Sequence, residues 1–387
     1  MAFLFVSQTM NAQQYPENPI VPGAERIPLI IPATKNRVVA IVANHTSMCG
    51  NVHLVDTLLA QGVNIKKIFC PEHGFRGTGD AGEFIKNGKD TKTGIPIISL
   101  YGKKLKPTAE DLKGIDVVIF DLQDVGVRFY TYISTLTYVM QACAEHFIPL
   151  FILDRPNPNG FYIDGPVLDM KNKSFVGMHP IPLVYGMTMA ELATMINEEG
   201  WLKTPEKCSI GVIPMYNYSH KYLYKLPVNP SPNLQNMESV YLYPSLGLFE
   251  GTVVNVGRGT DYPFRVFGNP KFPDTLFTYT PRSIENVSKD PPHLGIPCYG
   301  IDLRNLTEEE LTSHKTLNLD YLKTAYKLYP DKLHFFNKYF ENLAGNNVLR
   351  NQIIKGLSAD EIRQSWQPEI LKFKEIRKKY LIYEDFE

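Results

Sequence analysis

The chain has 387 residues, of which 44% are apolar, which exceeds what one hydrophobic core usually serves and favours two domains. Forty lysines and arginines balance forty aspartates and glutamates. This balance argues against nucleic acid or an anionic membrane surface as a partner, because neither would meet a strong positive field. Any anion-binding site must therefore be formed by a few basic residues at one place.

The N-terminal segment resembles the end of an export signal. Its first six residues are apolar and the small residue Ala12 precedes Gln13, but the usual basic residues are missing. We expect residues 1–20 to be a signal remnant or a disordered tail. We expect export to the periplasm or cell envelope, with a cytoplasmic location as the alternative. No stretch is long enough to span a bilayer, and the five scattered cysteines are expected to be free buried thiols.

Apolar runs alternate with helical patterns through the first part of the chain. The continuous apolar run at 38–43 predicts a strand buried on both faces. Further strands are predicted at 65–70, 95–100, 117–122 and 149–153, and helices at 53–61 and 133–147, with a short helix opened by the capping box of Thr108 and Asp111. This alternation predicts an α/β fold with a Rossmann-like, doubly wound parallel sheet.

The pattern changes beyond residue 165. Prolines, glycines and tyrosines become dense, as in the segments 229–233 and 243–247, and the C-terminus returns to helix after the capping box of Ser358 and Glu361. We therefore predict a Rossmann-like catalytic domain over 21–165. A second α/β or α+β domain over 166–387 would complete the cleft.

Polar residues follow every strand of the predicted sheet. Ligands of open parallel sheets bind at the carboxyl ends of the strands. Caps and turns would explain any one of these loops, but their collection on one edge favours a functional cleft. The candidate binding residues there are Asn44, His45, His73, Arg76, Asp121, Asp124, Arg128, Tyr130, Asp154, Arg155 and Asn157.

The loop after the second strand carries the candidate catalytic residues. Glu72 follows the strand directly, and Glu83 lies eleven residues further on. Two carboxylates facing one cleft are what glycoside hydrolysis requires, because one protonates the leaving oxygen and the other attacks or activates water. The alternative for Glu83 is a solvated loop residue.

Other catalytic classes find little support. The segment 77–82 matches G-x-G-x-x-G, but it neither follows a strand directly nor opens a good helix. The histidines and aspartates lack a metal-binding spacing, and a G-x-S-x-G elbow is absent. We therefore expect neither a metal nor a cofactor.

A second group of candidates lies in the segment 255–265. Glycines flank Arg258 and let the backbone approach a ligand closely, and Asp261 follows. Arg258 and Arg265 are suited to bind a carboxylate. The alternative is that they form salt bridges with Asp261 or Glu250.

At these loops the sequence resembles the NamZ-type exo-β-N-acetylmuramidases, formerly a domain of unknown function. The Ser365-Trp366 region fits as well. The matching segments are Asn44-His-Thr, Pro71-Glu-His-Gly-Phe-Arg-Gly, Ala81-Gly-Glu83, Thr93-Gly-Ile-Pro, Ser99-Leu-Tyr-Gly102, Phe120-Asp-Leu-Gln-Asp-Val-Gly-Val-Arg128, Asp154-Arg-Pro-Asn-Pro158 and Gly257-Arg-Gly-Thr260.

The resemblance implies a Rossmann-like domain, a second α/β domain and a cleft between them. It also implies release of N-acetylmuramic acid from non-reducing ends of peptidoglycan fragments, as in cell-wall recycling, with Glu72 and Glu83 as the catalytic pair. N-acetylmuramic acid carries a lactyl carboxylate that a neutral protein must read with a local cation. The candidates for that cation are Arg258, Arg128 and Arg155.

Two rival functions stay open from the sequence. One is a Rossmann-like hydrolase of another bond type, which would need a nucleophile or a phosphate loop. The other is a non-catalytic carbohydrate-binding protein, which needs aromatic platforms but no acid aimed at a linkage. The expected partners are muramyl saccharides, and no feature of the sequence indicates an oligomeric state.

Overall fold

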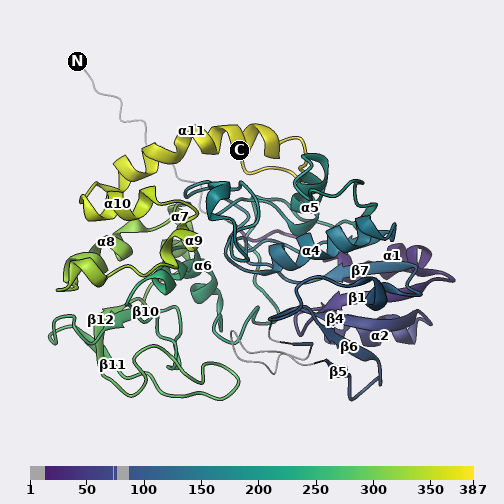
Figure 1. Ribbon diagram of the computed structural model, residues 1–387, viewed down its shortest axis with the longest axis horizontal. Helices are drawn as coiled ribbons and strands as arrows, with labels where there is room; N and C mark the ends of the chain where they lie inside the picture. The colour runs from purple at the N-terminus through teal and green to yellow at the C-terminus, as the bar shows by residue number, and fades with distance from the viewer. Residues whose placement is uncertain (1–13, 73, 76–86) are drawn as a thin grey trace.

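The computed structural model describes residues 14–72, 74–75 and 87–387. Two lobes lie side by side, one built on a large sheet and the other on C-terminal helices with a small sheet (Figure 1). Residues 1–13 of the predicted tail lie outside the described residues. In the part that follows, the Tyr15 hydroxyl contacts the second lobe, where it donates to both carboxylate oxygens of Glu308 at 2.9 and 3.1 Å.

The large sheet has seven strands in the order β5-β6-β4-β1-β7-β8-β9. This confirms the predicted Rossmann-like sheet, with an antiparallel edge strand, β5, added. Because β9 pairs with β8, the sheet also continues past the boundary predicted at residue 165. The strands are β1 (Val38–Ala43), β4 (Asn64–Cys70), β5 (Gly88–Lys89), β6 (Pro96–Ser99), β7 (Val117–Asp121), β8 (Leu150–Leu153) and β9 (Ile210–Ile213).

Helices cover both faces of this sheet (Figure 1). They are α1 (Ile27–Thr34) and α2 (Leu54–Ala60) on one face, and α4 (Tyr132–Glu145) and α5 (Met189–Glu198) on the other. Strand β1 shows why, since Val39 and Ile41 pack in one core cluster with α2 whereas Ala40 and Val42 pack in another with α4. Successive side chains of a strand point to opposite faces, so a strand that is apolar throughout requires a cover on each.

The second lobe combines an antiparallel sheet with short helices. The sheet has the order β10-β12-β11, formed by β10 (Val266–Asn269), β11 (Phe277–Tyr279) and β12 (Cys298–Asp302). The larger core cluster runs from β1 and α4 into this lobe, so the two lobes share a core. The helices are α6 (Met237–Leu246), α7 (Glu308–Ser313), α8 (Leu319–Leu328), α9 (Phe340–Ala344), α10 (Val348–Ile354) and α11 (Ala359–Arg377).

The remaining elements are short. Thr108 and Asp111 form the predicted capping box of α3 (Ala109–Leu112), and Ser358 and Glu361 form that of α11. Strands β2 (Met48–Cys49) and β3 (Val52–His53) make a hairpin before α2. The 3-10 helices are η1 (Gly23–Glu25), η2 (Met170–Asn172), η3 (Gly247–Gly251) and η4 (Lys332–His334).

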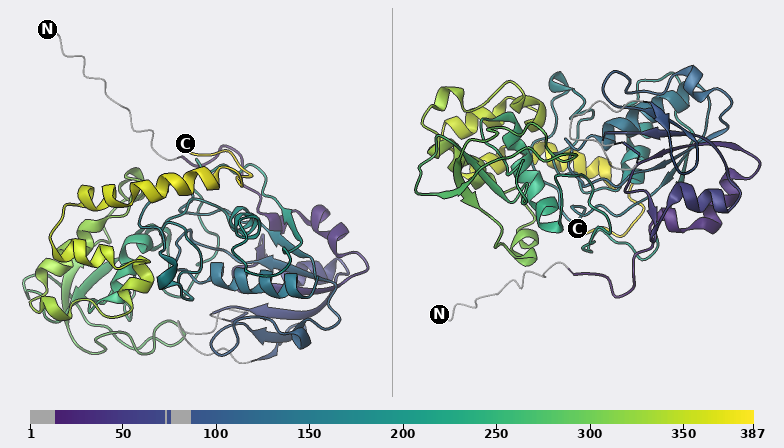
Figure 2. Two further views of the ribbon diagram at one scale, coloured as in Figure 1. Left: turned by 45° about the horizontal axis from the view of Figure 1, so that its top comes forward. Right: turned by 90° about the horizontal axis from the view of Figure 1, so that it is seen from below.

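The C-terminal helix α11 lies across both lobes (Figures 1 and 2). Its Trp366 indole donates to Asp164 at 2.9 Å. Near the end of the helix, Arg377 binds Asp385 and the carbonyl oxygen of Gly186. These buried polar contacts fix the helix in place, because leaving any of the groups unpaired would cost its full desolvation energy.

A buried ion pair joins neighbouring strand ends at the carboxyl edge of the sheet. Asp121 ends β7, and Arg155 follows β8 by two residues. Arg155 donates to the Asp121 carboxylate at 2.5 and 2.9 Å, and it also donates to the carbonyl oxygen of Met48 in the hairpin after β1. Because the guanidinium binds all three segments, it fixes the edge from which the candidate loops depart.

Cys70, Cys143, Cys208 and Cys298 are free and buried as predicted, whereas the free Cys49 is only half-buried. Within the described ranges, none of the helices has the length and apolar character needed to cross a bilayer.

Removing the charge of Asp121 is expected to destabilise the fold strongly. In Asp121→Asn the Arg155 guanidinium stays buried without its countercharge, and breaking such a pair costs about 3–5 kcal/mol. Urea unfolding followed by circular dichroism measures the loss. Asp261→Asn is the control, because Asp261 is 73% exposed in a surface pair with Arg282 and should change stability by less than about 0.5 kcal/mol. Equal stability of the two variants would contradict the prediction.

Candidate active site

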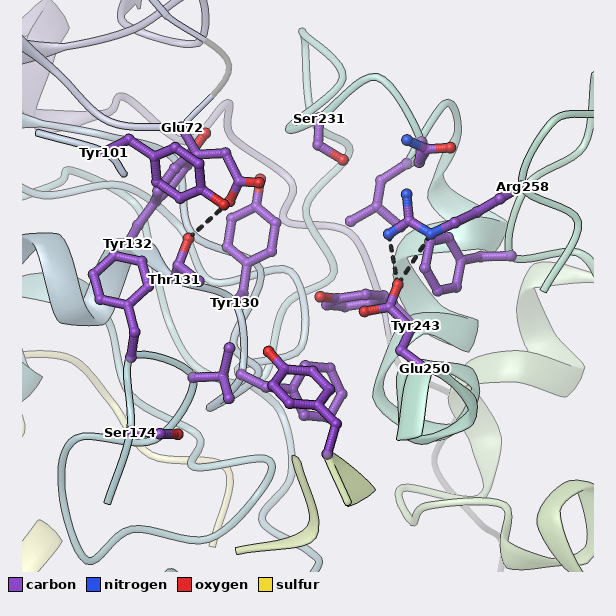
Figure 3. Close-up of a pocket in the computed structure, with 17 residues that line it drawn as sticks. Glu72, Tyr101, Tyr130, Thr131, Tyr132, Ser174, Ser231, Tyr243, Glu250 and Arg258 are labelled. Carbon is purple, nitrogen blue, oxygen red and sulfur yellow. Dashed lines mark hydrogen bonds and ion pairs between the residues drawn. The ribbon is translucent and has the colours of Figure 1, made fainter. Parts of the chain in front are cut away.

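A cavity of about 250 Å³ lies where the two lobes meet, and residues of both lobes line it (Figure 3). Its walls combine charged, hydroxyl and aromatic side chains. We call it the interlobe cavity. It is lined by Glu72, Tyr101, Phe129, Tyr130, Thr131, Tyr132, Ser174, Phe175, Val176, Ser231, Asn233, Leu234, Tyr243, Glu250, Arg258, Phe264 and Tyr339.

Glu72 forms one wall of the interlobe cavity. It lies two residues beyond the end of β4, at the carboxyl edge where the sheet presents its loops. The Thr131 hydroxyl donates to Glu72 Oε2 at 3.2 Å (Figure 3). Burial, then the charge of Glu72 and a hydrogen bond to it, raise the pKa of Tyr101. Tyr101 and Thr131 therefore both interact with the Glu72 carboxylate.

An ion pair forms the opposite wall. Arg258 Nε and Nη2 donate to one oxygen of Glu250, at 3.1 and 2.5 Å, and its guanidinium carbon lies 5.2 Å from the centre of the Phe264 ring. Burial opposes the charge of Arg258, but the charge and hydrogen bonds of Glu250 raise its pKa, with a further contribution from Glu72. Arg258 Nη1 has no hydrogen-bond partner among the residues that the structure describes, so it can still donate to a ligand.

The backbone around Arg258 is held in a turn that requires glycine. Gly257 and Gly259 have φ of 77° and 80°, a region that side chains other than glycine seldom adopt. A Cβ on Gly257 would come within 2.8 Å of the carbonyl oxygen of Tyr262. Asn255 accepts a 2.6 Å hydrogen bond from the Gly257 N–H and fixes the turn. The glycines predicted to let the backbone approach a ligand instead shape the turn that presents Arg258.

Five tyrosines contribute to the lining of the cavity. Burial raises the pKa of Tyr130, Tyr132 and Tyr243 well above its ordinary value. Burial, then the charges of Glu250 and Glu72, raise the pKa of Tyr339 to about 12. The phenols therefore stay neutral at physiological pH. They supply apolar ring faces together with hydroxyls that bind polar groups, a combination suited to a sugar.

The segment 229–234 crosses the cavity from one lobe to the other. His45 donates to the carbonyl oxygen of Asn229 at 2.9 Å, and the Tyr130 hydroxyl donates to that of Pro230 at 2.7 Å. On the other side, Asn233 Nδ2 donates to the carbonyl oxygen of Val287 at 2.8 Å. The Oδ1 of Asn233 is buried and has no partner within the described part of the chain. It is an acceptor that a ligand N–H or hydroxyl would satisfy.

Matches to one known family cover most of the chain. Residues 39–238 match the family described as "Exo-beta-N-acetylmuramidase NamZ, N-terminal", and residues 241–383 match "Exo-beta-N-acetylmuramidase NamZ, C-terminal". The chain belongs to the NamZ exo-β-N-acetylmuramidase family. This confirms the resemblance found in the sequence, and the two matches meet well beyond the domain boundary predicted at residue 165.

Individual relatives of the NamZ family are similar over nearly their whole length. The "Peptidoglycan beta-N-acetylmuramidase NamZ" of Bacillus subtilis (strain 168) is 39% identical over 370 residues, which cover 90% of this chain and 87% of the relative. A DUF1343 family protein of Bacteroides fragilis has a TM-score of 0.88 at 48% identity, covering 95% of this chain and 100% of its own. A second one has a TM-score of 0.78 at 27% identity, covering 94% and 99%.

Three of the candidate site residues predicted from the sequence line the cavity, namely Glu72, Tyr130 and Arg258. His73, Arg76 and Glu83 lie outside the described residues. His45 is not among the lining residues but holds the segment 229–234 that lines the cavity. Arg258 forms the salt bridge with Glu250 that was the alternative for it, and it also lines the cavity.

Both alternative cations for the lactyl acid lie in the interior, away from the lining. Arg128 is 2% exposed and donates to the carbonyl oxygens of Pro166, Ile181 and Leu343, so it joins the two lobes. Arg155 is committed to its ion pair with Asp121. We therefore correct the substrate-binding role predicted for Arg128, Arg155 and Asp121 to a structural one.

Four further candidates also serve the interior rather than the lining. Asn44 donates to the Tyr132 hydroxyl at 2.7 Å and so positions a cavity residue from behind. Asp154 accepts from Thr188 and Ala190 at the start of α5, and burial, then the charge of Glu191, raise its pKa to about 7. The other two are Asn157, which donates to the carbonyl oxygen of Met187, and Asp124, which accepts from Tyr185 and from the Gly126 N–H.

Asp261 and Arg265 also differ from expectation. Asp261 is exposed and pairs with Arg282 rather than with Arg258. Arg265 donates to the carbonyl oxygen of Arg304. Neither residue lines the cavity, whereas Arg258 and Phe264 of the same segment do.

Sequence reasoning missed several cavity residues. Tyr101 and Thr131 belong to loops at the sheet edge that the sequence singled out, so their position carried a signal. Asn233 and Tyr339 come from the second lobe, where no regular pattern marks a ligand-facing residue, and Glu250 was expected only as a salt-bridge partner of Arg258. Within the described ranges, no group of three or more His, Cys, Asp or Glu side chains is arranged to hold a metal ion.

The buried Asp124 is expected to make stability depend on pH. Burial raises its pKa from 3.8 to about 6, so between these values the folded state binds more protons than the unfolded state. Its stabilising contribution is complete below about pH 4 and is lost as the pH rises through 6, by roughly 2–3 kcal/mol. Urea unfolding of wild type and Asp124→Asn from pH 4 to 7 measures this, and parallel profiles would contradict it.

Proposed function

We propose that this protein is an exo-acting glycosidase that releases N-acetylmuramic acid from the non-reducing ends of peptidoglycan fragments. Membership of the NamZ family supports the proposal, as does the name of the Bacillus subtilis relative. The observation that carries it is the shared cavity of Glu72 and Arg258. One bound substrate could then contact both residues. Glu72 would reach its glycosidic oxygen, and Arg258 would bind its lactyl carboxylate.

In the proposed mechanism, Glu72 is the general acid. Its proton passes to the glycosidic oxygen while the C1–O bond breaks, and water completes the hydrolysis. The position of Glu72 directly after β4 supports this role, since a strand end aims a side chain more rigidly than a long loop does. Glu83 stays the predicted second carboxylate, which would support the developing positive charge.

Arg258 is the residue proposed to bind the lactyl carboxylate. Its pair with Glu250 uses Nε and Nη2 and holds the guanidinium plane in place. A ligand carboxylate that binds Nη1 would therefore meet a pre-oriented donor, which lowers the entropy cost of binding. The proposal includes no metal, and it places the protein in the periplasm or cell envelope, where peptidoglycan lies.

Replacing Glu72 tests the acid role through the leaving group. Glu72→Gln should lose roughly 10²–10⁴-fold in kcat on N-acetylmuramyl-β-1,4-N-acetylglucosamine. It should lose far less on a nitrophenyl β-N-acetylmuramide, because nitrophenolate departs without a proton. The readout is released N-acetylmuramic acid, and Glu110→Gln on the exposed start of α3 serves as the control.

Each outcome separates the candidate functions. Loss on the disaccharide alone supports general acid catalysis by Glu72. Equal loss on both substrates would assign Glu72 to another step. Binding of muramyl sugars by the wild type without any release would favour the carbohydrate-binding protein instead.

Replacing Arg258 tests recognition of the lactyl group. Arg258→Met should raise KM for the muramyl disaccharide about 10–100-fold, since a charge-assisted hydrogen bond is worth about 1.5–3 kcal/mol. Inhibition by free N-acetylmuramic acid should weaken equally, and inhibition by N-acetylglucosamine should not change. Arg258→Met with Glu250→Gln removes the stranded charge and should behave alike. Arg282→Met, at the surface, is the control; an unchanged KM in both Arg258 variants would rule the role out.

A further inference from the structure

Thr131 occupies the N-cap position, directly before the first residue of α4, but its side chain does not cap that helix. Threonine and serine at this position normally take an extended backbone and accept from an N–H of the first turn. Thr108, Thr188, Thr307 and Ser358 all do so in this protein. Thr131 has φ −75° and ψ −3°, a helical conformation, and its side chain makes no capping hydrogen bond.

The hydroxyl of Thr131 is instead directed to Glu72. It donates to Glu72 Oε2 at 3.2 Å, and both side chains line the interlobe cavity (Figure 3). The helix therefore forgoes the stabilisation that a capping hydroxyl provides. A local preference left unmet in a cavity wall is the pattern expected where function and folding compete for one group.

We propose that Thr131 is a positioning residue for Glu72. The inference rests on the proposed function. When Glu72 gives its proton to the glycosidic oxygen, the electron pair of the C1–O bond goes to that oxygen and a carboxylate remains on Glu72. The Thr131 hydroxyl holds the carboxyl group in place before the transfer and donates to the negative charge that develops during it.

The helix adds to this effect. Helix α4 has 14 residues, and its N-terminal end carries the partial positive charge of unpaired N–H groups. Since Thr131 precedes its first residue, Tyr132, the Glu72 carboxylate lies beside that positive end. Asn44 fixes the start of the helix from the sheet side by donating to Tyr132. Sheet and helix are thus held in register around the Thr131–Glu72 contact.

The test compares Thr131→Val, which keeps the shape but lacks the hydroxyl, with Thr131→Ser, which retains it. On the muramyl disaccharide, Thr131→Val should lower kcat about 10–100-fold with KM unchanged, and Thr131→Ser should stay within about threefold of wild type. On the nitrophenyl substrate, which needs no proton, Thr131→Val should lose less than about threefold. The urea midpoint of Thr131→Val should match that of wild type, because no cap is lost.

Thr307→Val is the matched control. Thr307 caps α7 outside the cavity, so this variant should lower the urea midpoint and keep kcat. An unimpaired Thr131→Val in an active enzyme would overturn the role of Thr131 alone. Equal loss on both substrates, or no rescue by serine, would overturn it as well by indicating a purely structural effect. A wild type that releases no N-acetylmuramic acid would refute the proposed function and this role with it.

Discussion

The buried ion pair of Asp121 and Arg155 is the constraint from which the site is built. Both side chains are almost fully removed from water, at 0% and 3% exposure. Such a pair is tolerable only when its geometry is good and its remaining donors are satisfied. Arg155 binds both oxygens of Asp121 through Nε and Nη2, and Nη2 also donates to the carbonyl oxygen of Met48. The ends of β7 and β8 and the hairpin after β1 therefore share one fixed edge.

The position of that edge determines where the residues that line the cavity lie. The chain that leaves β7 at Asp121 reaches the cavity eight residues later with Phe129, and α4 begins three residues after that, at Tyr132. The segment 229–234 is then held against this wall through His45 and Tyr130. Several residues that were predicted from the sequence to contact the substrate therefore do not line the cavity. They hold in place the residues that do line it.

Charge is distributed unevenly inside the cavity. Glu72 lies at one wall, and Arg258 with Glu250 at the other. Because Glu250 neutralises Arg258 in the absence of ligand, the arginine is not left as an isolated charge in a partly buried site. Nη1, which has no hydrogen-bond partner in the described part of the chain, is then the donor available to an anionic group. The surrounding neutral tyrosines add apolar surface without further charge.

The sequence by itself determined the parallel sheet, five of its seven strands to within a few residues and the position of Glu72 at a strand end. These features depend on local patterns, since apolar runs, caps and strand ends are set by neighbouring residues. The tertiary structure alone decided which polar residues line the cavity. Asp121 and Arg128 resemble ligand-binding residues in the sequence, yet both are buried in the interior. Asp121 pairs there with the buried charge of Arg155, and Arg128 donates to buried carbonyl oxygens that need a donor. Glu250 and Asn233 reach the cavity only through the packing of the second lobe, which no local pattern encodes.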